Sequence, residues 1–295
     1  MEIELFADER KRINGNWDYI GLLAVPRAQA PALLADLRSH RSTVGFDGQI
    51  KFGDLHSRGI GTRLDTAMGW LRILMDDAAN RKKREYFCIT GIDNSKLDYH
   101  LFGNDGSPKG KYANVYNRFF RASLLGLLRY CFPYGPIGIK NIYHDSEGNL
   151  QDHEYFDWHV IQQVSKEEPR VTFGQDRVVF VRSDPRMERV NPDASELIQY
   201  TDLILGTVTH TIQVPNRTNE GQMECAKLAL PFIREILSNP YKWSAQYDQL
   251  RRFSISHFPR TYQHELVDNL APGEYYQPAL GPIEEAAYGQ GNFGF

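Results

Sequence analysis

The most constraining feature of this sequence is the segment at 191–212, NPDASELIQYTDLILGTVTHTI, whose middle is apolar on almost every side when drawn as a helix. Asn191 is suited to cap this helix, and Pro192 to its first position, where a missing N–H costs nothing. A helix of this kind has to pack on other elements. The chain has 295 residues, 41% of them hydrophobic, which is ample for a core that buries it.

One carboxylate interrupts the apolar middle of this helix. Asp202 has Ile198 four residues before it and Leu205 three residues after it, so all three share one face. An ionised carboxylate on a packed face costs several kcal/mol or shifts its pKa unless it is paired or binds a cation. Two interpretations therefore remain: a buried Asp bonded to an Arg, a Tyr or a backbone amide, or a ligand of a metal ion.

The rest of the chain alternates between strand-like and helix-like segments. Two strands form a hairpin first, and mixed α and β segments follow, which predicts an α/β protein with a mixed sheet. The segment at 94–112 is polar and rich in Gly and Lys, as a long functional loop would be. The expected strands are 2–8, 17–25, 85–92, 137–145 and 177–184, and the expected helices are 31–40, 62–83, 113–132, 151–164, 191–212 and 221–238.

Composition excludes several classes of protein. No stretch approaches the roughly 18 uninterrupted apolar residues of a membrane helix, and the N-terminus lacks a signal pattern, so we expect a soluble cytoplasmic protein. Three cysteines without a CxxC pair argue against a disulfide framework and a zinc site. The formal net charge of −3 excludes a protein that is basic throughout, but it leaves room for a local basic groove.

Two further acidic positions lie at the predicted ends of strands. Asp8 and Glu9 close the first strand, and Asp145 closes the strand at 137–145. Taken singly, each is a solvated strand end or a turn cap. Together with Asp202 they predict more, because three carboxylates brought close repel strongly and oxygen-ligated Mg²⁺ or Mn²⁺ relieves that repulsion. A pair of such ions can activate water and stabilise the leaving oxygen in phosphodiester cleavage.

With these three aspartates the chain resembles the ribonuclease H-like fold. In that fold the first strand carries a catalytic Asp, a hairpin follows, a later strand ends in a second Asp, and a helix supplies another. More narrowly, it is similar to the domain of unknown function 3800 family within that fold. The stretches that carry the resemblance are FADER, GQIKFGDL, NIYHD and LIQYTDLILG, in that order between residues 2 and about 210. Arg10 and Lys11 stand where that family has Ser and Gly, and Gln49 stands where it often has Glu.

The resemblance implies a mixed β-sheet flanked by helices, with helical insertions. It places this ribonuclease H-like domain at 1–215, followed by a helical C-terminal extension and tail at 216–295. By the same resemblance Asp8, Asp145 and Asp202 are metal ligands for Mg²⁺ or Mn²⁺. Their implied companions are Glu9 or Glu147 as a further acid, Lys51 to neutralise a phosphate or orient a carboxylate, and Gln199 to hydrogen-bond a ligand.

Three basic clusters are candidates for contacts with nucleic acid. Arg10, Lys11 and Arg12 lie beside the expected site, where they could reach a phosphate backbone. The cluster at 81–84 is better explained by the C-terminal dipole of the preceding helix. The cluster at 251–252 lies among aromatic residues, as in single-strand binders, although a docking helix is the simpler interpretation.

The leading hypothesis is therefore a metal-dependent nuclease acting on RNA or DNA, in a prokaryotic defence setting that the resemblance alone suggests. The alternative is a non-catalytic module of the same fold that binds nucleic acid or a partner protein. A third version is an effector component gated by a partner. Association with further copies of the chain is left open.

Overall fold

The computed structural model describes residues 1–13, 16–55, 61–102, 108–146, 156–213, 219–238 and 252–258. Within them a mixed seven-stranded sheet forms the centre, in the order β5-β4-β1-β2-β3-β7, and β6 also pairs with β4. The first three strands are antiparallel neighbours, whereas β4 runs parallel to β1, and β7 runs parallel to β3. The strands are β1 (Glu2–Ile13), β2 (Trp17–Pro26), β3 (Tyr86–Asp93), β4 (Ile137–Asp145), β5 (Val171–Phe173), β6 (Val179–Val181) and β7 (Phe253–Phe258).

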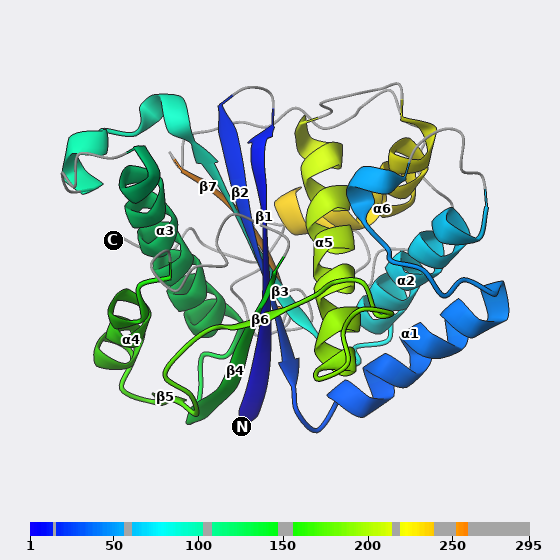
Figure 1. The fold of residues 1–295 in the computed structure, drawn as a ribbon, viewed down its shortest axis with the longest axis horizontal. Helices are drawn as coiled ribbons and strands as arrows, with labels where there is room; N and C mark the ends of the chain where they lie inside the picture. Colours follow the sequence, from blue (N-terminus) through cyan, green and yellow to red (C-terminus); the bar gives the residue numbers. More distant parts are fainter. Residues whose placement is uncertain are drawn as a thin grey trace, which may run out of the picture.

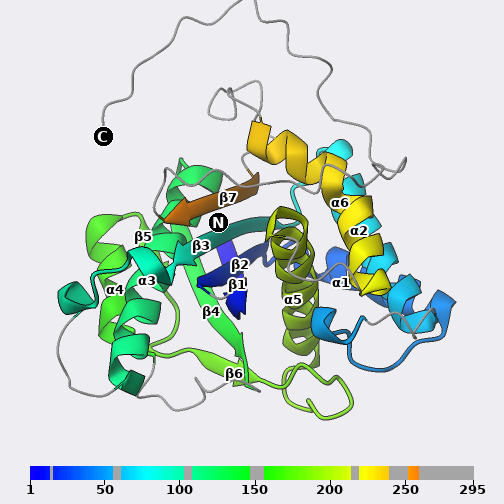
Figure 2. The same ribbon diagram turned by 90° about the horizontal axis from the view of Figure 1, so that it is seen from above.

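Helices cover both faces of this sheet (Figure 1). On one face lie α3 (Pro108–Cys131) and α4 (Trp158–Glu167), and on the other α5 (Pro192–Gln213) packs against β1, β2 and β4. A further layer consisting of α1 (Ala30–Val44), α2 (Thr62–Ala79) and α6 (Glu220–Ser238) covers the outer side of α5, as the view from above shows (Figure 2). Short 3-10 turns lie at Phe52–Asp54, Asn94–Lys96 and Tyr99–Phe102.

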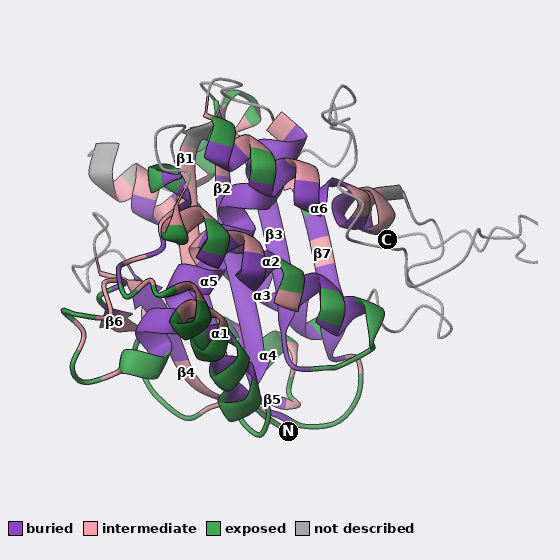
Figure 3. Cartoon of the chain, turned by 90° about the vertical axis from the view of Figure 1, so that its right-hand side faces the viewer, coloured by how far each residue is buried: buried purple, intermediate pink, exposed green. Residues whose placement is uncertain are grey.

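Helix α5 is therefore enclosed between the sheet and three other helices. Every residue from 194 to 212, all of them described, is buried except Asp202, which is half-buried. The sheet itself is buried along its central strands (Figure 3). Strand residues alternate between the two faces, so that Phe6 and Leu23 join the core beside α5 while Leu5 and Leu22 join the core beside α3.

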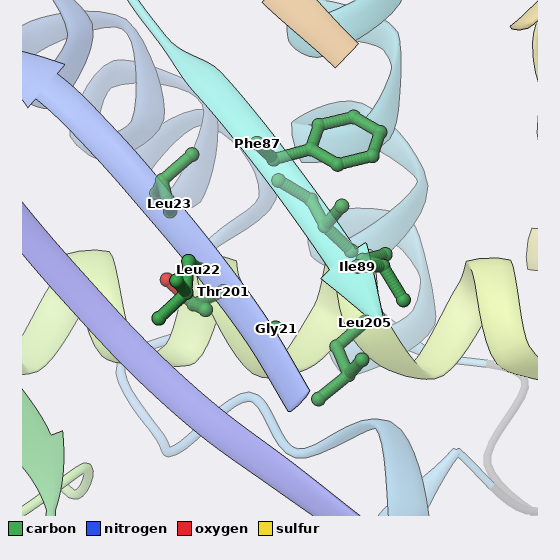
Figure 4. Close-up of a pocket in the computed structure, with 8 residues that line it drawn as sticks. Gly21, Leu22, Leu23, Phe87, Ile89, Thr201 and Leu205 are labelled. Carbon is green, nitrogen blue, oxygen red and sulfur yellow. The ribbon is translucent and has the colours of Figure 1, made fainter. Parts of the chain in front are cut away.

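A small apolar pocket lies where α5 crosses β2 and β3 (Figure 4). Gly21 lets the helix come close here, since a Cβ at this position would lie 3.2 Å from the side chain of Leu205. Thr201 is the polar side chain in the lining, and its hydroxyl already donates to the carbonyl of Leu197. The pocket offers no array of polar partners for a water molecule, so it is a packing gap and not a binding site.

The α/β class and the mixed sheet are confirmed, but several boundaries differ from the predicted ones. Strand β1 does not end at Asp8 and Glu9; it continues to Ile13, and residues 14 and 15 of the expected turn lie outside the described residues. The expected strand at 177–184 is the short β6, and β5 was not predicted. The expected helix at 151–164 begins at Trp158 in the described chain, and residues 147–155 lie outside it.

The C-terminal part is only partly the helical extension that was expected. Helix α6 matches the predicted helix at 221–238 and packs on α5 and α2. Residues 253–258, for which a docking helix was the simpler interpretation, instead form β7 and add an edge strand to the sheet beside β3. The expected tail from residue 259 onwards lies outside the described residues.

Two expectations from composition can be compared with the described chain. In that part, each helix is too short or too polar to cross a lipid bilayer. The three cysteines are all buried and are not joined to one another by a disulfide.

Candidate active site

The parallel pairing of β1 with β4 brings two of the predicted aspartates to the same end of the sheet. Phe6 pairs with Tyr143 in this register, and their rings stack with centroids 5.3 Å apart on the face toward α5. Asp8 and Asp145 each lie two residues further along, so their side chains emerge on that same face. Residues far apart in sequence thus become neighbours because the two strands run side by side in the same direction.

Asp202 meets this pair from the helix side. Its carboxyl group is in side-chain hydrogen-bond contact with that of Asp8. One of its oxygens, Oδ2, also accepts a hydrogen bond of 2.7 Å from the backbone N–H of Phe52. Asp145 acts on Asp8 through its charge. The core of the site is therefore the pair Asp8–Asp202, with Asp145 beside it.

The pKa values of Asp8 and Asp202 are both higher than those of ordinary aspartates. Burial raises the pKa of Asp8 well above its usual range, and the charges of Asp202, Glu9 and Asp145 raise it further. Burial also raises the pKa of Asp202, although the Phe52 amide and then the charge of Arg10 oppose that rise. Two carboxyl groups in contact share a proton unless a cation neutralises them, so the site is suited to a cation.

An extended segment before the 3-10 turn at Phe52–Asp54 holds Asp202 in place. The Ile50 amide donates to Oε1 of Gln199 over 2.7 Å, and the carbonyl of Phe52 accepts from Gln222 over 3.0 Å. Gln199 was expected to bind a ligand, but it is completely buried. Its amide oxygen accepts from Ile50 and Arg41, and its amide nitrogen donates to the carbonyl of Ser195. The stretches 48–55 and 197–206 therefore lie against each other.

Gly206 makes this contact possible. A Cβ added there would lie 2.2 Å from Cγ of Phe52, and that atom cannot move away without shifting the segment that donates to Asp202. We expect Gly206→Ala to destabilise the fold by about 1–3 kcal/mol, the usual cost of overpacking a core, measured by urea unfolding. Gly126→Ala in α3 is the matched control, since its Cβ meets open space and should stabilise by about 0.5–1 kcal/mol. Equal effects of the two changes would contradict the packing argument.

Asp145 is held by groups that the sequence did not indicate. Its Oδ2 accepts from the hydroxyl of Ser183 over 3.2 Å, and that hydroxyl accepts from the side-chain amide of Gln49 over 2.6 Å. Ser183 follows β6, whose pairing places Val181 opposite Asp145. No local pattern marks Ser183, because its role depends on the strand register.

Glu9 lies on the other face of the sheet, away from the aspartate pair. It forms ion pairs with His144 over 2.9 Å and with Lys11 over 3.2 Å. Burial would raise the pKa of Glu9, but these two cations outweigh it and lower the pKa. The structure thus gives Glu9 its own partners, and Glu147, the other expected acid, lies outside the described residues.

His144 lies on the side opposite Asp145, because neighbouring residues of a strand point to opposite faces. It is buried, its Nε2 lies 3.0 Å from the hydroxyl of Tyr116, and its Nδ1 lies 3.0 Å from the carbonyl of Asp145. Burial alone would lower the pKa of His144, but the carboxylate of Glu9 raises it above the ordinary value. The imidazolium form donates from both nitrogens, which suits this set of acceptors.

The basic residues expected to contact nucleic acid have different positions from one another. Arg10 is not at the tip of the hairpin; it lies in β1 and turns its guanidinium toward α5, within reach of the charges of Asp8 and Asp202. Lys11 pairs with Glu9, and its ammonium lies 4.6 Å from the ring centre of Tyr112. The side chain of Arg12 is outside the described residues.

Lys51 is half-buried immediately before the 3-10 turn, and its charge lowers the pKa of Asp202. This position is compatible with the expected role of orienting a carboxylate. In contrast, the other two basic clusters contribute buried ion pairs. Arg84 binds both oxygens of Asp77, and Arg252 pairs with Glu85 over 2.9 Å. The positions of Arg84 and Arg252 are therefore explained by these buried ion pairs. The helix dipole and binding of single-stranded nucleic acid are not needed to explain them.

Metal binding stays a prediction. Among the described residues, no group of three or more His, Cys, Asp or Glu side chains is arranged to hold a metal ion, so the three aspartates are not drawn together into one ligand set. No protein-family model matches the chain, and no curated protein is similar enough to count as a match.

Proposed function

We propose that this chain is a ribonuclease H-like, divalent-metal-dependent nuclease that hydrolyses phosphodiester bonds in RNA or DNA. The observation that carries the proposal is the contact between the carboxyl groups of Asp8 and Asp202, with Asp145 in the adjoining strand register. A first strand bearing an Asp, a following hairpin, a parallel strand ending in an Asp and a buried helix bearing a third are the arrangement expected of that fold. A cytoplasmic location, a role in prokaryotic defence and a protein partner belong to the same proposal.

The donor set fits a hard cation. The two contacting side chains offer only carboxylate oxygens, which Mg²⁺ and Mn²⁺ prefer. Burial raises the pKa of both carboxyl groups, and the neighbouring acids raise that of Asp8 further, so a bound cation would stabilise the ionised pair. Asp8 and Asp202 would hold the ion, and Asp145 would lie at its side. The chemistry supplied by such an ion is the activation of a water molecule and the stabilisation of the leaving oxygen.

The other residues of the site have identifiable tasks in this proposal. The Phe52 amide donates to one oxygen of Asp202 and so holds that carboxyl group in place. Lys51 lies beside Asp202 and supplies a positive charge suited to a phosphate oxygen. His144 holds the carbonyl of Asp145 from behind the sheet and thereby steadies the end of β4.

The test is a cleavage assay with purified protein on single- and double-stranded RNA and DNA. We expect cleavage with Mg²⁺ or Mn²⁺, its loss on chelation by EDTA, and its recovery when the metal is returned. Asp202→Asn should reduce the rate by at least about a thousandfold, because the change removes a ligand charge and leaves the shape. Cleavage by Asp202→Asn at the wild-type rate would refute the assignment.

The second candidate is a non-catalytic module of the same architecture that binds nucleic acid or a partner protein. The observation that favours it is Arg10, whose guanidinium already supplies part of the missing positive charge beside Asp8 and Asp202. Nucleic-acid binding without cleavage under every metal tested, by a protein shown to be folded, would support this module over the enzyme.

A further inference from the structure

We propose that the guanidinium of Arg10 takes the place of one cation in the aspartate site, so that the site accepts no more than one divalent ion. This inference rests on the proposed function, because it concerns the metal that the nuclease would use. Arg10 acts through Asp8 and Asp202 and is therefore a positioning residue.

The first step in the argument is the direction of the Arg10 side chain. It follows Asp8 by two residues in β1, so both side chains leave the strand on the face toward α5. One terminal nitrogen of the guanidinium donates to the carbonyl of Gly206 over 3.0 Å and to the hydroxyl of Thr209 over 2.8 Å. Arg10 thus ties the strand that carries Asp8 to the helix that carries Asp202.

The second step is the way this guanidinium is held. Its central carbon lies 4.9 Å from the ring centre of Phe52, in a cation–π contact. Phe52 is the residue whose amide donates to Asp202. Two hydrogen bonds and one ring therefore fix the positive charge in a partly buried position, where a guanidinium is more easily accommodated than an ammonium because it is more weakly hydrated. These contacts hold the guanidinium beside the residue whose amide binds Asp202.

The third step is the balance of charge. The pair Asp8–Asp202 carries two negative charges when ionised, and the charge of Asp145, which acts on Asp8, adds a third. Arg10 and Lys51 carry two positive charges. One divalent ion would turn the remaining single negative charge into a single positive one. A second divalent ion would leave three positive charges in a half-buried site, which is strongly unfavourable at the low effective dielectric constant of such a position.

The experiment measures metal stoichiometry and not catalysis. Mn²⁺ is titrated into metal-free protein by calorimetry, and the electron paramagnetic resonance spectrum distinguishes an isolated ion from a coupled pair. We expect the wild-type protein to bind no more than one Mn²⁺. Arg10→Gln should bind Mn²⁺ at least about tenfold more tightly or take up a second ion, because a fixed positive charge has been removed.

Two further variants separate charge from structure. Arg10→Lys keeps the charge and should keep the wild-type stoichiometry. Arg129→Gln is the control for losing an arginine elsewhere, since Arg129 is exposed and paired with Glu168 over 2.9 Å on the far side of the sheet, and it should bind as the wild type does. Circular dichroism checks that each variant is folded; if Arg10→Gln does not fold, the wild-type stoichiometry decides alone.

Several outcomes would overturn the inference: two ions in the wild-type protein, unchanged binding in folded Arg10→Gln, or no Mn²⁺ binding by any variant. These outcomes are distinguishable from a failure of the proposed function. Cleavage with two bound ions would refute the role of Arg10 and leave the nuclease intact. One bound ion without any cleavage would support the role of Arg10 and refute the nuclease.

Discussion

Asp8→Asn should abolish metal-dependent cleavage and at the same time make the metal-free protein more stable. Asp8 is the carboxylate with the least favourable surroundings in the site, because burial and three neighbouring acids raise its pKa well above the usual range. An amide of the same shape removes the charge that burial penalises. We expect a gain of about 1–2 kcal/mol at pH 7.5 without metal, as when a strained functional site is relaxed, and a loss of cleavage of at least about a thousandfold.

The stability difference between Asp8→Asn and the wild type should depend on pH, because Asp8 titrates differently in the folded and unfolded protein. The pKa of Asp8 is higher in the folded protein than in the unfolded chain. Its contribution to stability is therefore fully present below the unfolded pKa of about 3.9 and is lost as the pH rises through the folded pKa. The advantage of Asp8→Asn over the wild type should accordingly be absent in acid and grow toward neutral pH.

The measurement is urea unfolding of both proteins across this pH range in the presence of EDTA. Asp176→Asn is the control, because Asp176 is exposed and distant from the aspartate pair in the hollow lined by residues of α4, β5 and β6. That change should alter stability by no more than about 0.5 kcal/mol. A destabilised Asp8→Asn that still cleaves would show that Asp8 is an ordinary structural carboxylate.

Arg252→Leu should remove a large part of the stability of the fold. Arg252 is 1% exposed and its partner Glu85 is 0% exposed, so the change leaves a buried acid without its cation. The same guanidinium donates to the backbone carbonyls of Asp77, Lys82 and Glu85, which join the end of α2 to the start of β3. Breaking a buried pair from one side typically costs about 3–5 kcal/mol, and we expect a loss of that size in urea unfolding.

Two control variants test whether the loss of stability in Arg252→Leu comes from the buried ion pair. Arg129→Leu removes a half-exposed arginine that pairs with Glu168, and a surface pair of that kind is worth about 0–1 kcal/mol. Adding Glu85→Gln to Arg252→Leu should recover part of the loss, because the unpaired charge is gone. In hydrogen exchange, the amides of β7 should lose protection first, since Arg252 immediately precedes that strand. A loss no larger than that of Arg129→Leu would refute the buried pair.

The limits of prediction from sequence are clearest around Asp8. The adjacent acids Asp8 and Glu9 were interpreted as the end of a strand that stops at a metal site, but β1 continues to Ile13. What stops at this point is the pairing with β4, whose last residue is Asp145. A single strand carries no information about where its neighbour ends, so the position of Asp8 in the site could be suspected from the sequence but its reason could not.

The interaction partners of the charged residues could not be predicted from the sequence either. Glu9 and Arg10 follow Asp8 directly, yet Glu9 pairs with His144 on one face and Arg10 binds α5 on the other. Strand alternation predicts that these two side chains point in opposite directions. It does not say which helix covers each face, because that depends on the handedness and order of connections more than a hundred residues later.

By itself the sequence determined the elements whose pattern is local: the hairpin, the amphipathic helices and the enclosed helix with Asp202 in its middle, since periodicity and caps act within a few residues. Only the tertiary structure decided which distant groups meet. Sheet order and helix packing bring Asp202 to Asp8 and Arg252 to Glu85. They also place the guanidinium of Arg10 where it donates to the carbonyl of Gly206. Sheet order and helix packing are set by burial over the whole chain, where no short stretch of residues records the outcome.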